Sequence, residues 1–97
     1  MSQNETLRLD MVEKGLNSDI SHKGFTFHIQ TEDWGRANPF IVTQVFKSGK
    51  VVKMVKIPYA KVLPNGEKSD PHAVRSAVQF QHQSILDLLV SGHLISF

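Results

Sequence analysis

The chain of 97 residues has no cysteine, one tryptophan and one tyrosine. Without cysteine, neither a disulfide framework nor a thiolate metal site can form. No apolar run approaches the roughly 20 residues that a membrane-spanning helix needs. The opening residues, MSQNETLRLD, have neither the basic nor the apolar region of a signal peptide. We therefore expect a cytoplasmic protein that is neither exported nor inserted in a membrane.

The chain also has almost no excess of one charge. It contains eleven basic and nine acidic side chains, which leaves a net charge of +2. The basic residues are unevenly placed, and one stretch holds Lys47, Lys50, Lys53, Lys56 and Lys61. A chain of this length has room for one modest core, so we expect a single domain. Such a domain is marginally stable alone, which favours a dimer or a bound partner.

Three segments have the pattern of β-strands, namely residues 24–32, 40–47 and 50–57. In the first, Phe25, Phe27 and Ile29 alternate with polar side chains, which is typical of a strand with one buried face. Ser48-Gly49 between the other two fits a two-residue hairpin turn, because glycine readily takes a positive φ.

This turn sets a register in which Lys47 pairs with Lys50, Phe46 with Val51 and Val42 with Val55. One face of the hairpin then carries Phe40, Val42, Phe46, Val51, Val55 and Ile57, and we expect this face to form the core. The opposite face carries Ile41, Val45, Val52 and Met54, which makes it too apolar for simple exposure to solvent.

A long helix is predicted from Pro71 to about Ser91. Asp70 is placed to cap it, Pro71 suits its first position, and Gly92 suits its end. An apolar stripe at helical spacing consists of Val74, Ala77, Val78, Ile85, Leu88 and Leu89. Leu86 and Val90 lie outside this stripe, so the last two turns are apolar over a wide arc.

The predicted architecture is therefore α+β, a three-stranded antiparallel sheet packed on one long C-terminal helix in the order β-β-β-α. Residues 24–97 form the single domain. Residues 1–23 are either a tail or a short helix, in which Leu9, Val12 and Leu16 share one side and Gly15 ends the helix.

The sequence shows no set of side chains that suits catalysis. Its five histidines include no HxxxH pair, and no phosphate-binding or nucleophile motif occurs. We therefore expect no enzyme activity, no catalytic residues, no metal site and no cofactor.

The function predicted from these patterns is a protein–protein interaction module, either a homodimer or a subunit of a regulatory complex. Trp34 has two interpretations, since a loop tryptophan can cover one end of the core or anchor a partner. If Trp34 anchors a partner, Glu32, Asp33 and Arg36 supply charge complementarity to that partner. The full predicted interface is Glu32, Asp33, Trp34, Arg36, Ile41, Val45, Val52, Met54, Leu86 and Val90.

The alternative is nucleic-acid binding through Lys47, Lys50, Lys53 and Lys56. With a first helix, the order would be that of a double-stranded-RNA-binding domain. However, Arg75 is the only basic residue at the start of the long helix, and the phenylalanines are assigned to the core face, where no base can stack on them. Lysines on a solvated face or a protected sheet edge are the simpler interpretation.

The run from His28 to Gly35, HIQTEDWG, resembles a signature of small bacterial proteins, with the segment from Pro39 to Thr43 as its continuation. Gly49 to Val52 and Tyr59 extend the resemblance, which covers about residues 24–95. Proteins of this kind belong with motility and cell-polarity systems, some of them built around Ras-like GTPases. The resemblance implies a small regulatory subunit and carries over no active-site residue.

Overall fold

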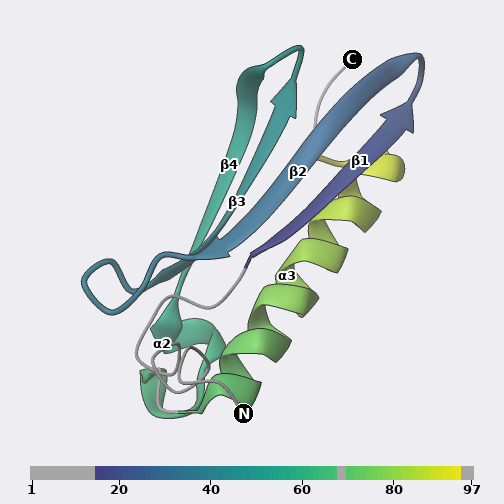
Figure 1. Ribbon diagram of the computed structural model, residues 1–97. Coiled ribbons are helices and arrows are strands. Elements are labelled where there is room, and N and C mark those ends of the chain that lie inside the picture. Colours follow the sequence, from purple (N-terminus) through teal and green to yellow (C-terminus); the bar gives the residue numbers. More distant parts are fainter. Residues whose placement is uncertain (1–14, 68–69, 95–97) are drawn as a thin grey trace, which may run out of the picture.

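The computed structural model describes residues 15–67 and 70–94 (Figure 1). An antiparallel sheet in the order β1-β2-β3-β4 is followed by a long helix across one of its faces. The elements are β1 (Leu16–His22), β2 (Phe25–Asp33), β3 (Phe40–Lys47), β4 (Lys50–Pro58), α2 (Tyr59–Val62), the 3-10 turn η1 (Pro64–Gly66) and α3 (Pro71–Val90). The predicted α+β fold, with an antiparallel sheet and a long C-terminal helix, is confirmed, but the sheet has four strands and not three.

The additional strand, β1, lies in the segment for which the sequence predicts a tail or a short helix. Its sequence, LNSDISH, is rich in residues that are depleted in strands, so propensity alone does not reveal it. A two-residue turn at Lys23 and Gly24, with φ of 51° and 82°, joins it to β2. Leu16 pairs with Thr31 in the sheet and is therefore not helical. Leu9 and Val12, the other two positions of the predicted helix, lie outside the described residues.

The β3–β4 hairpin has the predicted tight turn, in which Ser48 and Gly49 have φ of 54° and 78°. The predicted pairs next to the turn, Lys47 with Lys50 and Phe46 with Val51, are confirmed. Beyond them β4 contains one extra residue, because Val45 pairs with Lys53 and Val52 has no opposite residue. The predicted register is therefore wrong by one residue over the rest of the hairpin.

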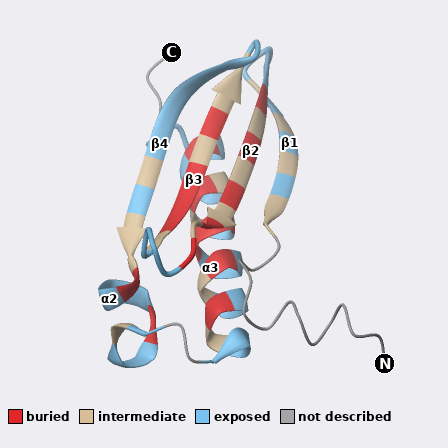
Figure 2. Ribbon diagram, turned by 60° about the vertical axis from the view of Figure 1, so that its left-hand side comes forward, coloured by how far each residue is buried: buried red, intermediate tan, exposed pale blue. Residues whose placement is uncertain are grey.

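The two faces of β3 are the reverse of the prediction, whereas Phe27 and Ile29 of β2 are buried as predicted. Ile41 and Val45 are fully buried under α3, since β2 pairs Ile29 with Val45 and places both on the face that carries Phe27. Phe40, Val42 and Phe46, predicted on the helix-facing side, alternate onto the opposite face of the sheet, where Val42 is nevertheless buried and Phe40 and Phe46 are half-buried. Figure 2 shows the buried positions of β2 and β3 above α3, whereas β4 is largely exposed.

Helix α3 begins and ends where the sequence predicts. The Asp70 side chain accepts a hydrogen bond from the backbone N–H of His72 at 2.9 Å, Pro71 takes the first helical position, and Gly92 follows the helix with φ of 82°. Of the predicted stripe, Leu88 is 41% exposed. The buried side of the helix consists of Val74, Val78, Gln81, His82, Ile85 and Leu89.

The core between sheet and helix has two apolar clusters. One cluster consists of Phe27, Ile29, Val45, Ile85 and Leu89. The other consists of Ile41, Tyr59, Leu63, Val74 and Val78. Four buried polar residues, Thr31, Thr43, Gln81 and His82, occupy the positions between the two clusters on their strands and helix. The centre of the core is therefore polar.

Candidate functional site

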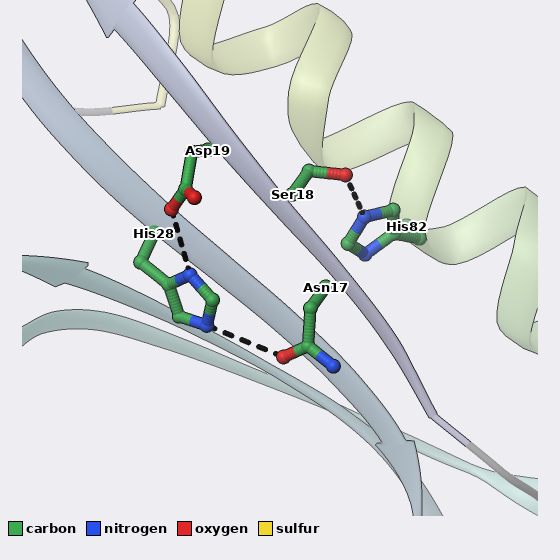
Figure 3. Close-up of polar contacts among 5 residues, drawn as sticks. All are labelled: Asn17, Ser18, Asp19, His28 and His82. Carbon is green, nitrogen blue, oxygen red and sulfur yellow. Dashed lines mark hydrogen bonds and ion pairs between the residues drawn. The ribbon is translucent and has the colours of Figure 1, made fainter.

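The polar centre of the core is a continuous chain of hydrogen bonds. Gln81 Nε2 donates to Thr43 Oγ1 at 3.0 Å, and the Thr43 and Thr31 hydroxyls lie 2.7 Å apart. Thr31 Oγ1 lies 2.8 Å from Nδ1 of His82, whose Nε2 lies 2.8 Å from Ser18 Oγ (Figure 3). Three strands and α3 are thus joined at one level.

One direction of donation fits this chain throughout. Gln81 donates to the Thr43 hydroxyl, which donates to the Thr31 hydroxyl. The Thr31 hydroxyl donates to Nδ1 of His82, and the Nε2–H of His82 donates to the Ser18 hydroxyl. The imidazole is then neutral, and both of its nitrogens have partners. Burial lowers the pKa of His82, and the charge of His28 lowers it further. This chain is structural, because it joins elements inside the core.

Asp33, a predicted interface residue, is also structural. It is fully buried, and its Oδ1 accepts hydrogen bonds from the backbone N–H of Gly35 at 2.9 Å and from the hydroxyl of Tyr59. Burial raises the pKa of Tyr59, and the neighbouring Asp33 carboxylate raises it further. The Asp33 carboxylate joins the β2–β3 loop to the start of α2 and does not face a partner, so the prediction of an interface role is wrong for Asp33.

The remaining predicted interface residues do not form one surface. Ile41 and Val45 are core residues, and Leu86 is half-buried against the first apolar cluster. Val52 and Met54 are each 43% exposed on β4, whereas Val90 is exposed at the end of α3, in the other layer. The predicted docking face across the hairpin and the helix is therefore wrong.

Trp34 lies next to a lysine of β4. Its ring is half-buried, and the Lys56 ammonium lies 5.2 Å from the Trp34 ring centroid and 4.5 Å from that of Phe40. Glu32 is half-buried on the open face of the sheet, and Arg36 is exposed in the loop. The tryptophan therefore covers the open face at one end of β3 and β4.

An apolar groove with a volume of about 660 Å³ lies between β4 and α3. Val55 and Ile57 of β4 form one wall, Ala77 and Phe80 of α3 form the other, and Val62 of α2 lies at one end. The complete lining is Val55, Ile57, Val62, Pro64, Ala73, Ser76, Ala77, Phe80, Gln81, Ser84 and Ile85. The lining is almost entirely uncharged, which suits an apolar ligand surface.

The groove is open because α3 packs mainly on β1, β2 and β3 and reaches β4 through Gln81, whose Nε2 donates to the Val55 carbonyl oxygen at 3.4 Å. Phe80 is 75% exposed, far more than any other large apolar side chain in the described part of the chain. Phe80 is not among the interface residues predicted from the sequence. Phe80 lies outside the apolar stripe yet among the small residues Ser76, Ala77 and Ser84, and this pattern is a signal for an exposed binding side.

The open face of the sheet carries a second group of side chains. The His28 and Phe46 rings are stacked, with centroids 5.9 Å apart and planes inclined by 11°. His28 Nδ1 lies 2.9 Å from Asp19 Oδ1, and its Nε2 lies 3.2 Å from Asn17 Oδ1 (Figure 3). These residues lie on the side of the sheet opposite Ser18 and His82, as the alternation of β1 requires.

The four lysines of the alternative prediction have different surroundings. The Lys47 ammonium lies 3.8 Å from the Phe25 ring centroid, and Lys56 lies over Trp34 and Phe40. Lys50 and Lys53 are exposed on β4. Lys47 and Lys53 pair with Phe27 and Val45 on the helix-facing side of the sheet, whereas Lys56 lies on the open face, so the lysines do not form one surface.

Residues 15–67 and 70–94 include no group of three or more histidine, aspartate or glutamate side chains that could hold a metal ion. None of the helices described there is long and apolar enough to cross a membrane. Comparison of the chain with protein-family models, with curated proteins and with solved structures gave no match.

Proposed function

We propose that the chain is a cytoplasmic, non-enzymatic protein-interaction domain, a small regulatory subunit that binds its partner through the groove between β4 and α3. The exposed Phe80 inside an apolar groove of about 660 Å³ carries this proposal. Contiguous exposed apolar surface marks an interaction site, and aromatic residues are enriched at the centres of interfaces. The resemblance to small bacterial regulatory proteins points to the same class of function.

Co-purification of the tagged protein from its native cell, followed by mass spectrometry, tests the proposal. The wild type is compared with Phe80→Gln and with Val90→Gln. Val90 is a matched control, because it is another exposed apolar residue of α3 but does not line the groove. We expect the partner to remain with Val90→Gln and to be lost with Phe80→Gln. Equal recovery with all three proteins would exclude the groove as the binding site.

A second candidate function, binding of single-stranded nucleic acid, is favoured by the reversed sheet faces. Phe40 and Phe46 lie on the open face with His28 and Lys56, so the argument that buried phenylalanines cannot stack on bases no longer holds. Sheets that bind single-stranded RNA use exposed aromatic rings in this way.

Fluorescence anisotropy with labelled oligo(U) and oligo(dT) tests this second function at about 50 mM salt, where phosphate contacts are strong. Binding through the open face should weaken in Phe46→Ala and should persist in Phe80→Gln. A protein that binds neither oligonucleotide under these conditions does not have this function.

A further inference from the structure

The geometry points to a specific occupant of the groove, and this inference rests on the proposed function. We propose that the groove binds an amphipathic α-helix of about twelve residues from a partner protein, with acidic side chains along the flank that meets β4. The width of the sheet supports a helix as the occupant, the length of the groove gives the length of that helix, and the distribution of charge indicates its acidic flank.

The width of the sheet favours a helix. Four strands spaced about 4.8 Å apart span roughly 14 Å between the outer backbones, and one helix with its side chains is about 10 Å wide. Helix α3 lies over β2, two strand spacings or about 10 Å from β4, and packed helices lie about 8–10 Å apart, so a second helix beside α3 would lie over β4. A helix there would complete the second layer of the domain.

The length of the groove sets the length of this helix. The groove follows α3 from Ala73 to Ile85, which at about 1.5 Å per residue is roughly 18 Å, or slightly more than three turns. Ser76, Ala77 and Ser84 are small, so the backbone of a second helix can approach α3 closely, with Phe80 inserted between its side chains.

The charges around the groove indicate that the acidic flank of the bound helix meets β4. No aspartate or glutamate occurs from Trp34 to Gly66, so β3, β4 and α2 carry no acidic side chain. Lys53 precedes Val55 and Ile57 on the side of β4 that pairs with the core residues Val45, Thr43 and Ile41. An acidic flank along β4 therefore finds an opposite charge, whereas the α3 wall presents only uncharged side chains.

One polar atom of a groove residue also lacks a hydrogen-bond partner. Gln81 lines the groove and is only 7% exposed, and its Oε1 is buried without a partner among the described residues. A hydroxyl or amide donor on the apolar side of the bound helix would satisfy this oxygen, because buried polar atoms are nearly always paired.

Two other occupants fit less well. An added strand would have to pair with the outer edge of β4, which carries exposed lysines, the extra residue Val52 and a terminal Pro58, and all three features hinder pairing. A second copy of the described chain offers α3 as its one long helix, and the exposed side of that helix has a single carboxylate, Asp87.

Selection from a displayed library of random 14-residue peptides tests the occupant. Peptides are selected on the wild-type protein and counter-selected on Phe80→Gln. We expect apolar residues at helical spacing, with aspartate or glutamate enriched along one flank. A selected peptide should bind Lys53→Glu at least fivefold more weakly, and Lys23→Glu, which makes the same charge change far from the groove, less than twofold more weakly.

Enriched peptides that alternate every second residue, that are basic, or that bind Lys53→Glu as well as the wild type would overturn the acidic helix. So would a failure to enrich any peptide, or a dimer in light scattering that dissociates in Phe80→Gln. None of these results alters the co-purification test. In that test, loss of the partner from Phe80→Gln supports the groove as the binding site, and equal recovery of the partner excludes it.

Discussion

At the scale of residues, the polar centre of the core is the feature that the sequence did not predict. Gln81 and His82 interrupt the apolar stripe of α3 at positions that helical spacing places on the same side as Val78 and Ile85. Their partners Thr31 and Thr43 lie on strands 38 to 51 residues away in the chain. Only the pairing of β2 with β3 shows that these four residues meet.

His82 makes the stability of the protein depend on pH. Because burial lowers its pKa in the folded state, the unfolded chain binds more protons once the pH falls below about 6.5, the ordinary histidine value. The free energy of unfolding should therefore fall as the pH decreases from about 6.5 to 5, with a slope from this residue of up to about 1.4 kcal/mol per pH unit. Urea unfolding at a series of pH values measures this slope.

The matched variants are His82→Gln and His72→Gln. Glutamine at position 82 stays neutral and retains hydrogen-bonding groups, so its slope should be flatter than that of the wild type. His72 is exposed on the first turn of the same helix, and its replacement should leave the slope unchanged. An unchanged slope in His82→Gln would show that other groups cause the pH dependence.

Tyr59 and Asp33 should be energetically coupled. Tyr59→Phe removes the hydroxyl that donates to a buried carboxylate, and we expect it to lower the free energy of unfolding by about 2 kcal/mol. Asp33→Asn keeps an acceptor oxygen but removes the charge. A double-mutant cycle measures the coupling, and the two effects should add to more than the effect of the double variant. Strict additivity would contradict the contact.

At the scale of elements, the sequence predicts well whatever is determined locally. The cap at Asp70, the end at Gly92 and the turn at Ser48-Gly49 each depend on a few neighbouring residues, and all three are present. The sheet faces are determined by pairing between distant strands. Both faces of β3 are apolar, so its own alternation cannot show which one is buried.

The extra residue in β4 also led to a wrong assignment of side chains to the sheet faces. Val52 moves every later residue of the strand by one position relative to β3, and nothing in the sequence marks it. The predicted core face therefore combined Phe40 and Val42, which lie on the open face, with Val55 and Ile57, which line the groove. The groove, which needs the correct faces, could not be predicted.

The N-terminal cap of α3 gives a prediction at this scale. Asp70→Ala removes the acceptor for the His72 N–H and should lower the free energy of unfolding by about 1 kcal/mol. Asp70→Asn keeps an acceptor oxygen and should lose much less. Chemical denaturation followed by helical circular dichroism compares the three proteins. Equal losses for alanine and asparagine would mean that the charge of Asp70, and not its hydrogen bond, stabilises the helix.

At the scale of the whole molecule, the domain has one helix for a sheet that is wide enough for two. The core lies under α3 and the groove lies beside β4, and Gln81 and Ile85 belong to both. Phe27→Ala removes a fully buried ring and should cost about 3–5 kcal/mol. Phe80→Gln changes an exposed ring and should alter stability by only about 0.5 kcal/mol. Thermal unfolding of both variants measures the contrast, and a Phe80→Gln protein as unstable as Phe27→Ala would place that ring in the core.

The uncovered strand should also be the part of the sheet that opens first. Strand β4 has one neighbour and is largely exposed, whereas β2 lies between two strands and under α3. In hydrogen exchange followed by mass spectrometry, we expect the amides of residues 50–58 to exchange faster than those of residues 25–33. A partner that fills the groove covers β4 and binds only the folded protein, so it should slow exchange at β4 more than at β2. If β4 exchanges as slowly as β2 in the isolated protein, the strand is already covered and the groove is not available to a partner.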